Sequence, residues 1–173
     1  MDLPENKPHR FSTKPPKGLM ALLVLTWINT LFSLVSTLFT LIFVRPKSAD
    51  LAKDKVEMAK SIVELRKQGL DSVVDLLERI QAMTEALQPY FLELNLVNLL
   101  VLTVGAVSAL LMYRRNILGF HLYILYNLAS VGSIYLFVSP SVVPSIIIIV
   151  NSAFSLLFVL LYARHLTWLN AQD

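Results

Sequence analysis

Three asparagines stand out because each lies near the middle of a long apolar segment without charged residues: Asn29, Asn127 and Asn151. An amide side chain both donates and accepts hydrogen bonds, and a lipid bilayer supplies no partners for it. Segments of similar length align their midpoints, so we expect the three amides at a similar depth inside a helix bundle. Such a polar layer is either a structural clasp or a binding site. The clasp is favoured because midplane binding sites usually accompany broken helices.

Two ionisable residues, Glu93 and His121, lie close to the ends of these apolar segments. An ionisable side chain deep in a bilayer marks an ion or proton path by default. Both residues are expected near an interface, within reach of water. They are kept as candidate ionisable sites, with an ordinary solvated role favoured over a proton relay.

Residues for catalysis or metal binding do not cluster in the sequence. It has no cysteine, and His9, His121 and His165 are far apart without helical pairing, so thiolate and histidine metal sites are not expected. Neither a G-x-S-x-G turn nor a Walker-type phosphate loop occurs. No basic patch alternates with aromatic residues in the way that favours nucleic acids. We expect a non-enzymatic protein with no cofactor and no nucleic-acid partner.

The elements that position these side chains are predicted to be transmembrane helices. Apolar residues make up 55% of the chain and charged residues 16%, against a usual charged share of about 25%. Residues 18–44, 94–113 and 116–163 contain no Asp, Glu, Lys or Arg. Crossing the hydrocarbon takes about 20 apolar residues. The first two segments therefore fit one span each, and the third fits two with a break near Pro140 and Pro144.

The predicted organisation follows from these segments. The first apolar run is longer than the roughly 7–15 residues of a cleavable signal sequence, so it is read as a retained span. The predicted parts are a disordered cytoplasmic tail (1–17), four transmembrane helices (18–44, 91–113, 116–138 and 141–163), an extramembrane segment (45–90) and a cytoplasmic C-terminal tail (164–173).

The segment 48–88 is rich in charges of both signs and repeats apolar residues at heptad spacing, which predicts amphipathic helix. One unbroken helix of this length would hold its two ends about 60 Å apart. Lys67-Gln68-Gly69 has the pattern of a helix end with glycine, and Asp71 or Ser72 can begin the next helix. We therefore predict a helical hairpin with helices near 48–68 and 71–88. The alternative is one helix that bends at Gly69 and pairs its seam with another chain. The apolar seam of this predicted coiled coil comprises Val56, Ala59, Val63, Leu70, Val73, Leu77, Ile80 and Leu87.

The distribution of basic residues predicts the orientation of the spans. With four spans, both termini and the Arg114-Arg115 turn lie on one side, and the uncharged 139–141 turn lies on the other. Because short cytoplasmic segments are enriched in Lys and Arg, both termini are predicted to be cytoplasmic.

The order of span, long loop, and three further spans joined by short turns resembles that of claudin-type proteins, although the loop lacks the Trp and Cys residues of that family. The run Arg-Arg-Asn-Ile-Leu-Gly-Phe-His-Leu-Tyr (114–123) is a basic turn that leads into an aromatic-rich span. In this it resembles uncharacterised small four-span bacterial inner-membrane proteins. The resemblance implies a bacterial inner-membrane location and brings no activity with it.

Three functions are compatible with this organisation. The favoured one is an accessory or scaffold protein that binds a protein partner, or a second copy of itself, through the hairpin and the bundle surface. The alternative is a small transporter or channel with a path lined by Asn, Ser and Thr. A membrane-embedded enzyme ranks last. A water-filled cavity that reaches Asn127 would favour the transporter over the scaffold.

Overall fold

The structure, a computed structural model, describes residues 14–44 and 48–170, and within these ranges every regular element is a helix. Four helical segments are long and apolar enough to cross a membrane, which confirms the predicted all-α class and the four long apolar helices. They contain α1 (Lys17–Phe43), α4 (Phe91–Tyr113), α5 (Ile117–Gly132) and α6 (Ser145–Ala163). The tail predicted over 1–17 lies mostly outside the described residues.

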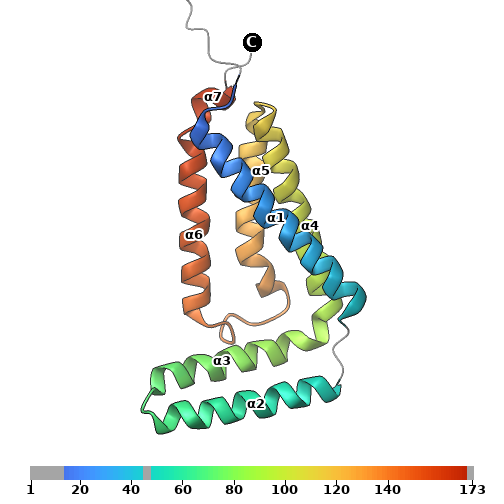
Figure 1. The fold of residues 1–173 in the computed structure, drawn as a ribbon, viewed down its shortest axis with the longest axis vertical. Helices are drawn as coiled ribbons and strands as arrows, with labels where there is room; N and C mark the ends of the chain where they lie inside the picture. The colour runs from blue at the N-terminus through green and yellow to red at the C-terminus, as the bar shows by residue number, and fades with distance from the viewer. Residues whose placement is uncertain (1–13, 45–47, 171–173) are drawn as a thin grey trace, which may run out of the picture.

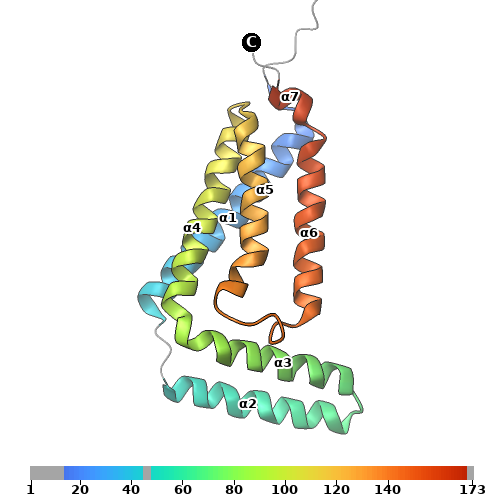
Figure 2. The same cartoon turned by 180° about the vertical axis from the view of Figure 1, so that it is seen from behind.

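The four apolar helices run alternately up and down, so the connections gather at two ends (Figure 1). The start of α1, the α4–α5 turn and the short helix α7 (Leu166–Asn170) lie at one end. At the other end, α2 (Ser48–Lys67) and α3 (Asp71–Leu87) lie across the base of the bundle, and α2 is the farther of the two from it (Figures 1 and 2). Helix α1 crosses the bundle obliquely, starting beside α6 and ending beside the base of α4.

Helices α4 and α5 pack closely because small residues line their contact. Gly119 of α5 lies against the backbone of α4: a Cβ added there would stand 2.5 Å from Met112 N and 2.7 Å from Ser108 O. Gly105 of α4 lies against the ring of Tyr126, where an added Cβ would stand 2.8 Å from ring carbons. Small residues allow two helix backbones to approach in this way.

Helix α1 buries a polar face. Thr26, Thr30 and Thr37 are buried and follow one another at spacings of four and seven residues, as one helical face requires. The Asn98 side-chain amide of α4 donates to Thr37 Oγ1 at 3.2 Å. Thr30 is buried on this face, whereas the neighbouring Asn29 is exposed.

The break between α2 and α3 falls at Gln68-Gly69. Gly69 has φ +74°, and its N–H donates to Arg66 O while the N–H of Leu70 donates to Leu65 O, both at 3.1 Å. This is the Schellman arrangement, in which a left-handed residue satisfies the last carbonyls of a helix and reverses the chain. The two helices begin and end within one residue of their predicted bounds.

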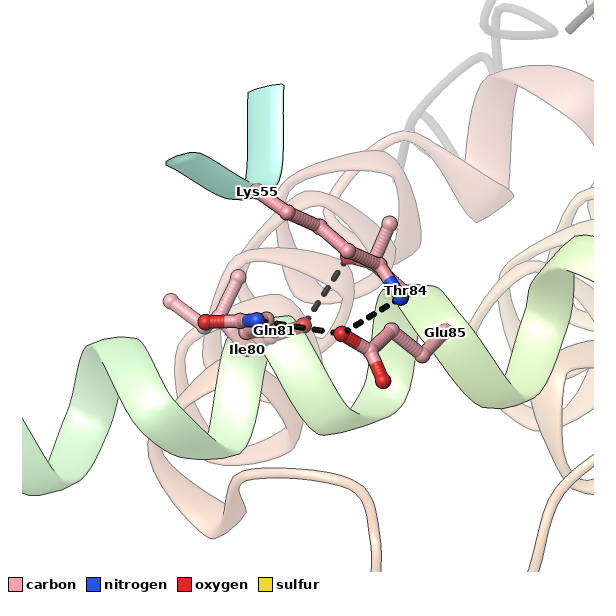
Figure 3. A network of polar contacts seen from close by, with 5 residues as sticks. All are labelled: Lys55, Ile80, Gln81, Thr84 and Glu85. Carbon is pink, nitrogen blue, oxygen red and sulfur yellow. Dashed lines mark hydrogen bonds and ion pairs between the residues drawn. The ribbon is translucent and has the colours of Figure 1, made fainter. Parts of the chain in front are cut away.

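Helices α2 and α3 lie side by side and antiparallel (Figures 1 and 2). Lys55 Nζ of α2 lies 3.2 Å from Glu85 Oε1 of α3, and the Gln81 amide donates to the same oxygen at 3.0 Å (Figure 3). The Gln81 amide, followed by the Lys55 ammonium, lowers the pKa of the Glu85 carboxyl. Nearer the turn, Arg66 Nη2 lies 2.8 Å from Glu78 Oε1. These exposed ion pairs set the register of the two helices and add little stability.

The last connection differs from its predicted bounds. Helix α5 ends at Gly132 and passes through a short 3-10 turn, Ser133–Leu136, while α6 begins at Ser145 rather than at residue 141. The residue before a proline is disfavoured in helical conformation, so Pro144 stands directly before the helix instead of inside it. The link over 137–144 is thus longer than the 139–141 turn that the sequence predicted.

The buried core lies at the α7 end. Leu19, Leu23, Met112 and Tyr162 are at most 2% exposed, and the α7 residues Trp168 and Leu169 pack on the same cluster. The Arg115 guanidinium lies 5.1 Å from the Trp168 ring, a cation–π contact. Arg115 also has φ +57°, a conformation that glycine adopts most easily. The Arg114-Arg115 turn, from which the orientation of the spans was predicted, therefore also anchors α7.

Candidate functional site

A cavity of about 460 Å³ lies between α1, α5 and α6. This volume falls within the range of about 300–1,000 Å³ that small-molecule sites occupy. Half of its lining residues carry an amide or hydroxyl side chain other than a phenol, and aromatic and aliphatic residues supply the rest. The lining residues are Leu25, Thr26 and Asn29 of α1, Tyr123, Tyr126, Asn127, Ser130 and Val131 of α5, and Asn151, Phe154, Ser155 and Phe158 of α6.

The α7 end of the cavity is closed by a bond between its walls. Thr26 Oγ1 of α1 and the Tyr162 phenol of α6 form a hydrogen bond of 2.8 Å, and Tyr162 is 0% exposed. The Tyr162 ring lies 4.6 Å from that of Tyr123 on α5, measured between centroids. One residue of α6 therefore ties that helix to both of the others.

A second cluster of hydroxyl groups lies beside this bond. Thr30 Oγ1 is fully buried, and the Tyr126 phenol is its polar neighbour, but no hydrogen bond of ordinary geometry joins them. The Tyr123 phenol has Thr26 and Asn127 as its polar neighbours. The inner wall of the cavity is thus rich in neutral groups that both donate and accept.

All three of the predicted asparagines line this one cavity. Asn127 is buried, and its amide donates to Tyr123 O, one turn earlier on its own helix, at 2.8 Å. Asn29 and Asn151 are exposed at the cavity edge, and neither has a hydrogen-bond partner in the part of the chain that the structure describes.

The expected hydrogen bond between two of these amides is not present. Among the residues of α6, only Tyr162 is buried, and the α6 residues packed on the core are Phe158, Val159 and Ala163, all in its C-terminal half. At the level of Asn151, α6 therefore stands away from α1 and α5. The clasp was predicted from the equal depth of the three amides, and equal depth does not bring α6 close to α1 and α5.

The chemistry of the cavity is that of uncharged polar groups. No Asp, Glu, Lys, Arg or His lines it, and no group of three or more metal-ligating side chains occurs within residues 14–44 and 48–170. The candidate ionisable residues lie elsewhere. Glu93 is exposed in the first turn of α4, and His121 is exposed on α5, with Nδ1 3.1 Å from Ile117 O. The structure does not bring these two residues to the cavity.

Sequence reasoning missed the role of Tyr162. Aromatic and basic residues at the end of a span, here Tyr162, Arg164 and Trp168, favour an interfacial anchor instead. Its partner Thr26 lies 136 residues away. No local periodicity signals such a pair, so only the packing of α6 against α1 identifies it.

Comparison with known proteins does not assign this chain to a family. No protein-family model, no curated protein sequence and no solved structure matches it. Function must therefore be inferred from the geometry of the helices and of the cavity alone.

Proposed function

We propose that this chain is a four-span protein of the bacterial inner membrane that acts as a non-enzymatic accessory or scaffold protein. In this proposal α1, α4, α5 and α6 cross the bilayer, both termini are cytoplasmic, and α2 and α3 form an extramembrane hairpin on the opposite face. The hairpin binds an amphipathic helix of a protein partner.

The observation that carries this proposal is an apolar stripe on the hairpin that the chain itself leaves uncovered. The contact between α2 and α3 buries Ile62 and Val74. By contrast, the seam residues Val56 and Val63 are 54% and 53% exposed. The heptad seam that the sequence displays is therefore only partly used within the hairpin.

Lipid is poorly placed to cover this stripe. Helix α2 lies farther from the four apolar helices than α3 in both views (Figures 1 and 2), so the bundle and the bilayer around it are on the other side of α3. Exposed apolar patches on soluble surfaces mark interaction sites. A protein helix is the occupant that such a surface fits, with anchors spaced at three, four and seven residues.

The charges beside the stripe indicate the character of the partner. A shallow groove on α2 is lined by Val56, Ala59 and Val63 together with Lys60, Glu64 and Lys67. Two lysines against one glutamate leave the groove basic. A partner helix with acidic residues beside its apolar anchors would complement it, since charge complementarity selects partners and their register.

The partner interface can be tested with a photo-crosslinker on a cysteine introduced at Ala59, because the chain has no cysteine of its own. In native membranes we expect one adduct with another protein. Val63→Glu should reduce that adduct more than about tenfold, because it would place a carboxylate in the apolar contact, opposite the acidic residues proposed for the partner helix. The matched control is Ser61→Glu, an exposed position on another face of α2, which should leave the adduct intact.

Two outcomes would contradict the proposed interface. Equal loss of the adduct in Val63→Glu and Ser61→Glu would show that the exposed seam is not what the partner binds. An adduct only with a second copy of this chain would show that the hairpin forms a homo-oligomer and does not bind a different protein.

The proposed orientation predicts where a cysteine at Ser61 can be labelled. Ser61 is exposed on α2, so Ser61→Cys should react with a membrane-impermeant maleimide added to cells whose outer membrane has been made permeable. A cysteine at Thr167, which is exposed on α7, should react only after the inner membrane is disrupted. The reverse pattern would place the hairpin in the cytoplasm and invert the orientation.

A second candidate function is the binding or movement of a small molecule. The specific observation in its favour is the polar cavity that reaches Asn127 between α1, α5 and α6. This candidate uses the bundle rather than the hairpin, so the two functions are independent of each other.

A further inference from the structure

We propose that the cavity between α1, α5 and α6 is a binding site for an uncharged lipid whose head carries hydroxyl or carbonyl groups, and that this ligand enters sideways from the bilayer. The proposal deepens the second candidate function and does not depend on the hairpin. Its basis is the position of the cavity mouth, the closure of both cavity ends and the uncharged lining.

We take the mouth of the cavity to be where its exposed lining residues on α1 and α6 lie. Asn29 and Asn151 come from these two facing helices and are exposed, whereas Asn127 on α5 is buried and forms part of the floor. The apolar residues beside the mouth are also open: Leu25 is 50% exposed and Phe154 is 59% exposed. A cavity bordered by exposed apolar side chains opens toward hydrocarbon when its helices span a bilayer.

Neither end of the bundle offers a clear route from water. Toward α7, the hydrogen bond between Thr26 and Tyr162 joins two walls of the cavity, and Tyr162 is completely buried. At the opposite end, the 137–144 link and α3 lie across the bundle (Figures 1 and 2), and Val138 and Val143 of that link are buried. A ligand from the lipid phase fits this arrangement better than a solute that crosses along the axis.

The mouth also contains polar groups that lack partners. Asn29 lies near the middle of α1, and neither it nor Asn151 has a protein hydrogen bond in the ranges that the structure describes. At mid-bilayer depth an amide without a partner is costly, because hydrocarbon offers no hydrogen bonds. A bound head group with hydroxyl or carbonyl oxygens would satisfy these amides.

The lining selects against a charged head group. With no ionisable side chain other than tyrosine in the cavity, a phosphate or an ammonium would stay unpaired in a medium of low dielectric constant. Amides and hydroxyls suit a neutral head, since each can both donate and accept. Tyr126, Phe154 and Phe158 add flat apolar surface. Two lipid classes have this chemistry, the neutral glycerolipids and the isoprenoid quinones.

The test uses the full chain in nanodiscs with three photoactivatable probes: a diazirine diacylglycerol, an azido-ubiquinone, and a diazirine phosphatidic acid with the same acyl chains as the first. We expect saturable labelling by at least one neutral probe, with peptides from α1, α5 or α6 modified, and little labelling by phosphatidic acid. The neutral probe that labels identifies the class of ligand.

The variant that tests the site is the double substitution Asn29→Leu with Asn151→Leu. Both positions are exposed, so the fold should tolerate the change. Loss of two ordinary hydrogen bonds should reduce labelling about tenfold. The matched control is Asn95→Leu on α4, whose amide donates to its own helix at Phe91 O and which does not line the cavity; its labelling should equal that of the wild type.

Each other result has a defined meaning. If phosphatidic acid labels the wild type and labels the double variant less, the cavity is a lipid site but the proposed preference for a neutral head group is wrong. Labelling by all probes that is equal in the wild type and the double variant would overturn the site itself, and with it the second candidate function. A further outcome is that no probe labels the chain, while glycerol enters proteoliposomes with the wild type and not with the double variant. That result would support the second candidate function and contradict the proposal that the ligand is a lipid.

Discussion

Replacing Gly119 by alanine is expected to unfold the bundle more effectively than any other single-methyl change among the described glycines. A Cβ at this position would meet Met112 N at 2.5 Å and Ser108 O at 2.7 Å, and both are backbone atoms of α4. A backbone cannot rotate aside as a side chain can, so α4 and α5 would have to separate. Overpacking commonly costs about 1–3 kcal/mol and occasionally more, and we expect the upper end or beyond.

The measurement is the midpoint of thermal unfolding in a mild detergent, followed by circular dichroism and by size-exclusion elution. A loss of about 3 kcal/mol should lower that midpoint by roughly 6–12 °C for a chain of this size. Gly132→Ala is the matched control, because a Cβ there would have no neighbouring atom within 4 Å. Midpoints for the two variants within a degree of each other would show that α4 and α5 do not pack as the structure has them.

Replacing Tyr162 by alanine is expected to release α6 from the rest of the bundle. Tyr162 is 0% exposed, contacts the ring of Tyr123 and forms the hydrogen bond to Thr26. It is also the one buried residue of α6, so no other part of that helix can compensate for its loss. Truncating a buried aromatic side chain to alanine typically costs about 3–5 kcal/mol.

The variant Tyr162→Phe separates packing from hydrogen bonding. It keeps the ring against Tyr123 and removes only the hydroxyl group, and an interhelical hydrogen bond of this kind contributes about 0.6 kcal/mol, up to roughly 1.7. We therefore expect a small decrease of the unfolding midpoint for Tyr162→Phe and a large one for Tyr162→Ala. Equal decreases would mean that the bond to Thr26, rather than ring packing, holds α6 in place.

The hairpin shows how far local sequence signals reach. The turn was predicted from Lys67-Gln68-Gly69, and the left-handed φ of Gly69 follows from a property of that residue alone. The sequence did not predict correctly which apolar residues the two helices of the hairpin bury. Heptad spacing identified apolar positions, but Ile62 is buried between the helices while Val56 and Val63 remain exposed. Spacing identifies which residues share a face, and the rotation of each helix about its axis decides which face meets the partner.

The same division applies to the cavity. The sequence placed Asn29, Asn127 and Asn151 at one depth, and all three line one cavity. Depth follows from counting residues along a helix at a fixed rise of about 1.5 Å per residue. The distance between facing helices does not follow from the local sequence. The predicted hydrogen bond between amides is therefore absent, and a cavity lies between these helices instead.

The sequence by itself determined the class of this protein and the bounds of most of its helices. Runs of about 20 apolar residues and a glycine in the α2–α3 turn act over a few residues of backbone, so they can be identified without a fold. Only the tertiary structure decided that Gly119 must be glycine, that Tyr162 joins three helices, and that α6 leaves a polar cavity open. These features depend on contacts between residues far apart in the chain, such as the bond between Thr26 and Tyr162, and the angle and separation of packed helices are set by the whole contact surface.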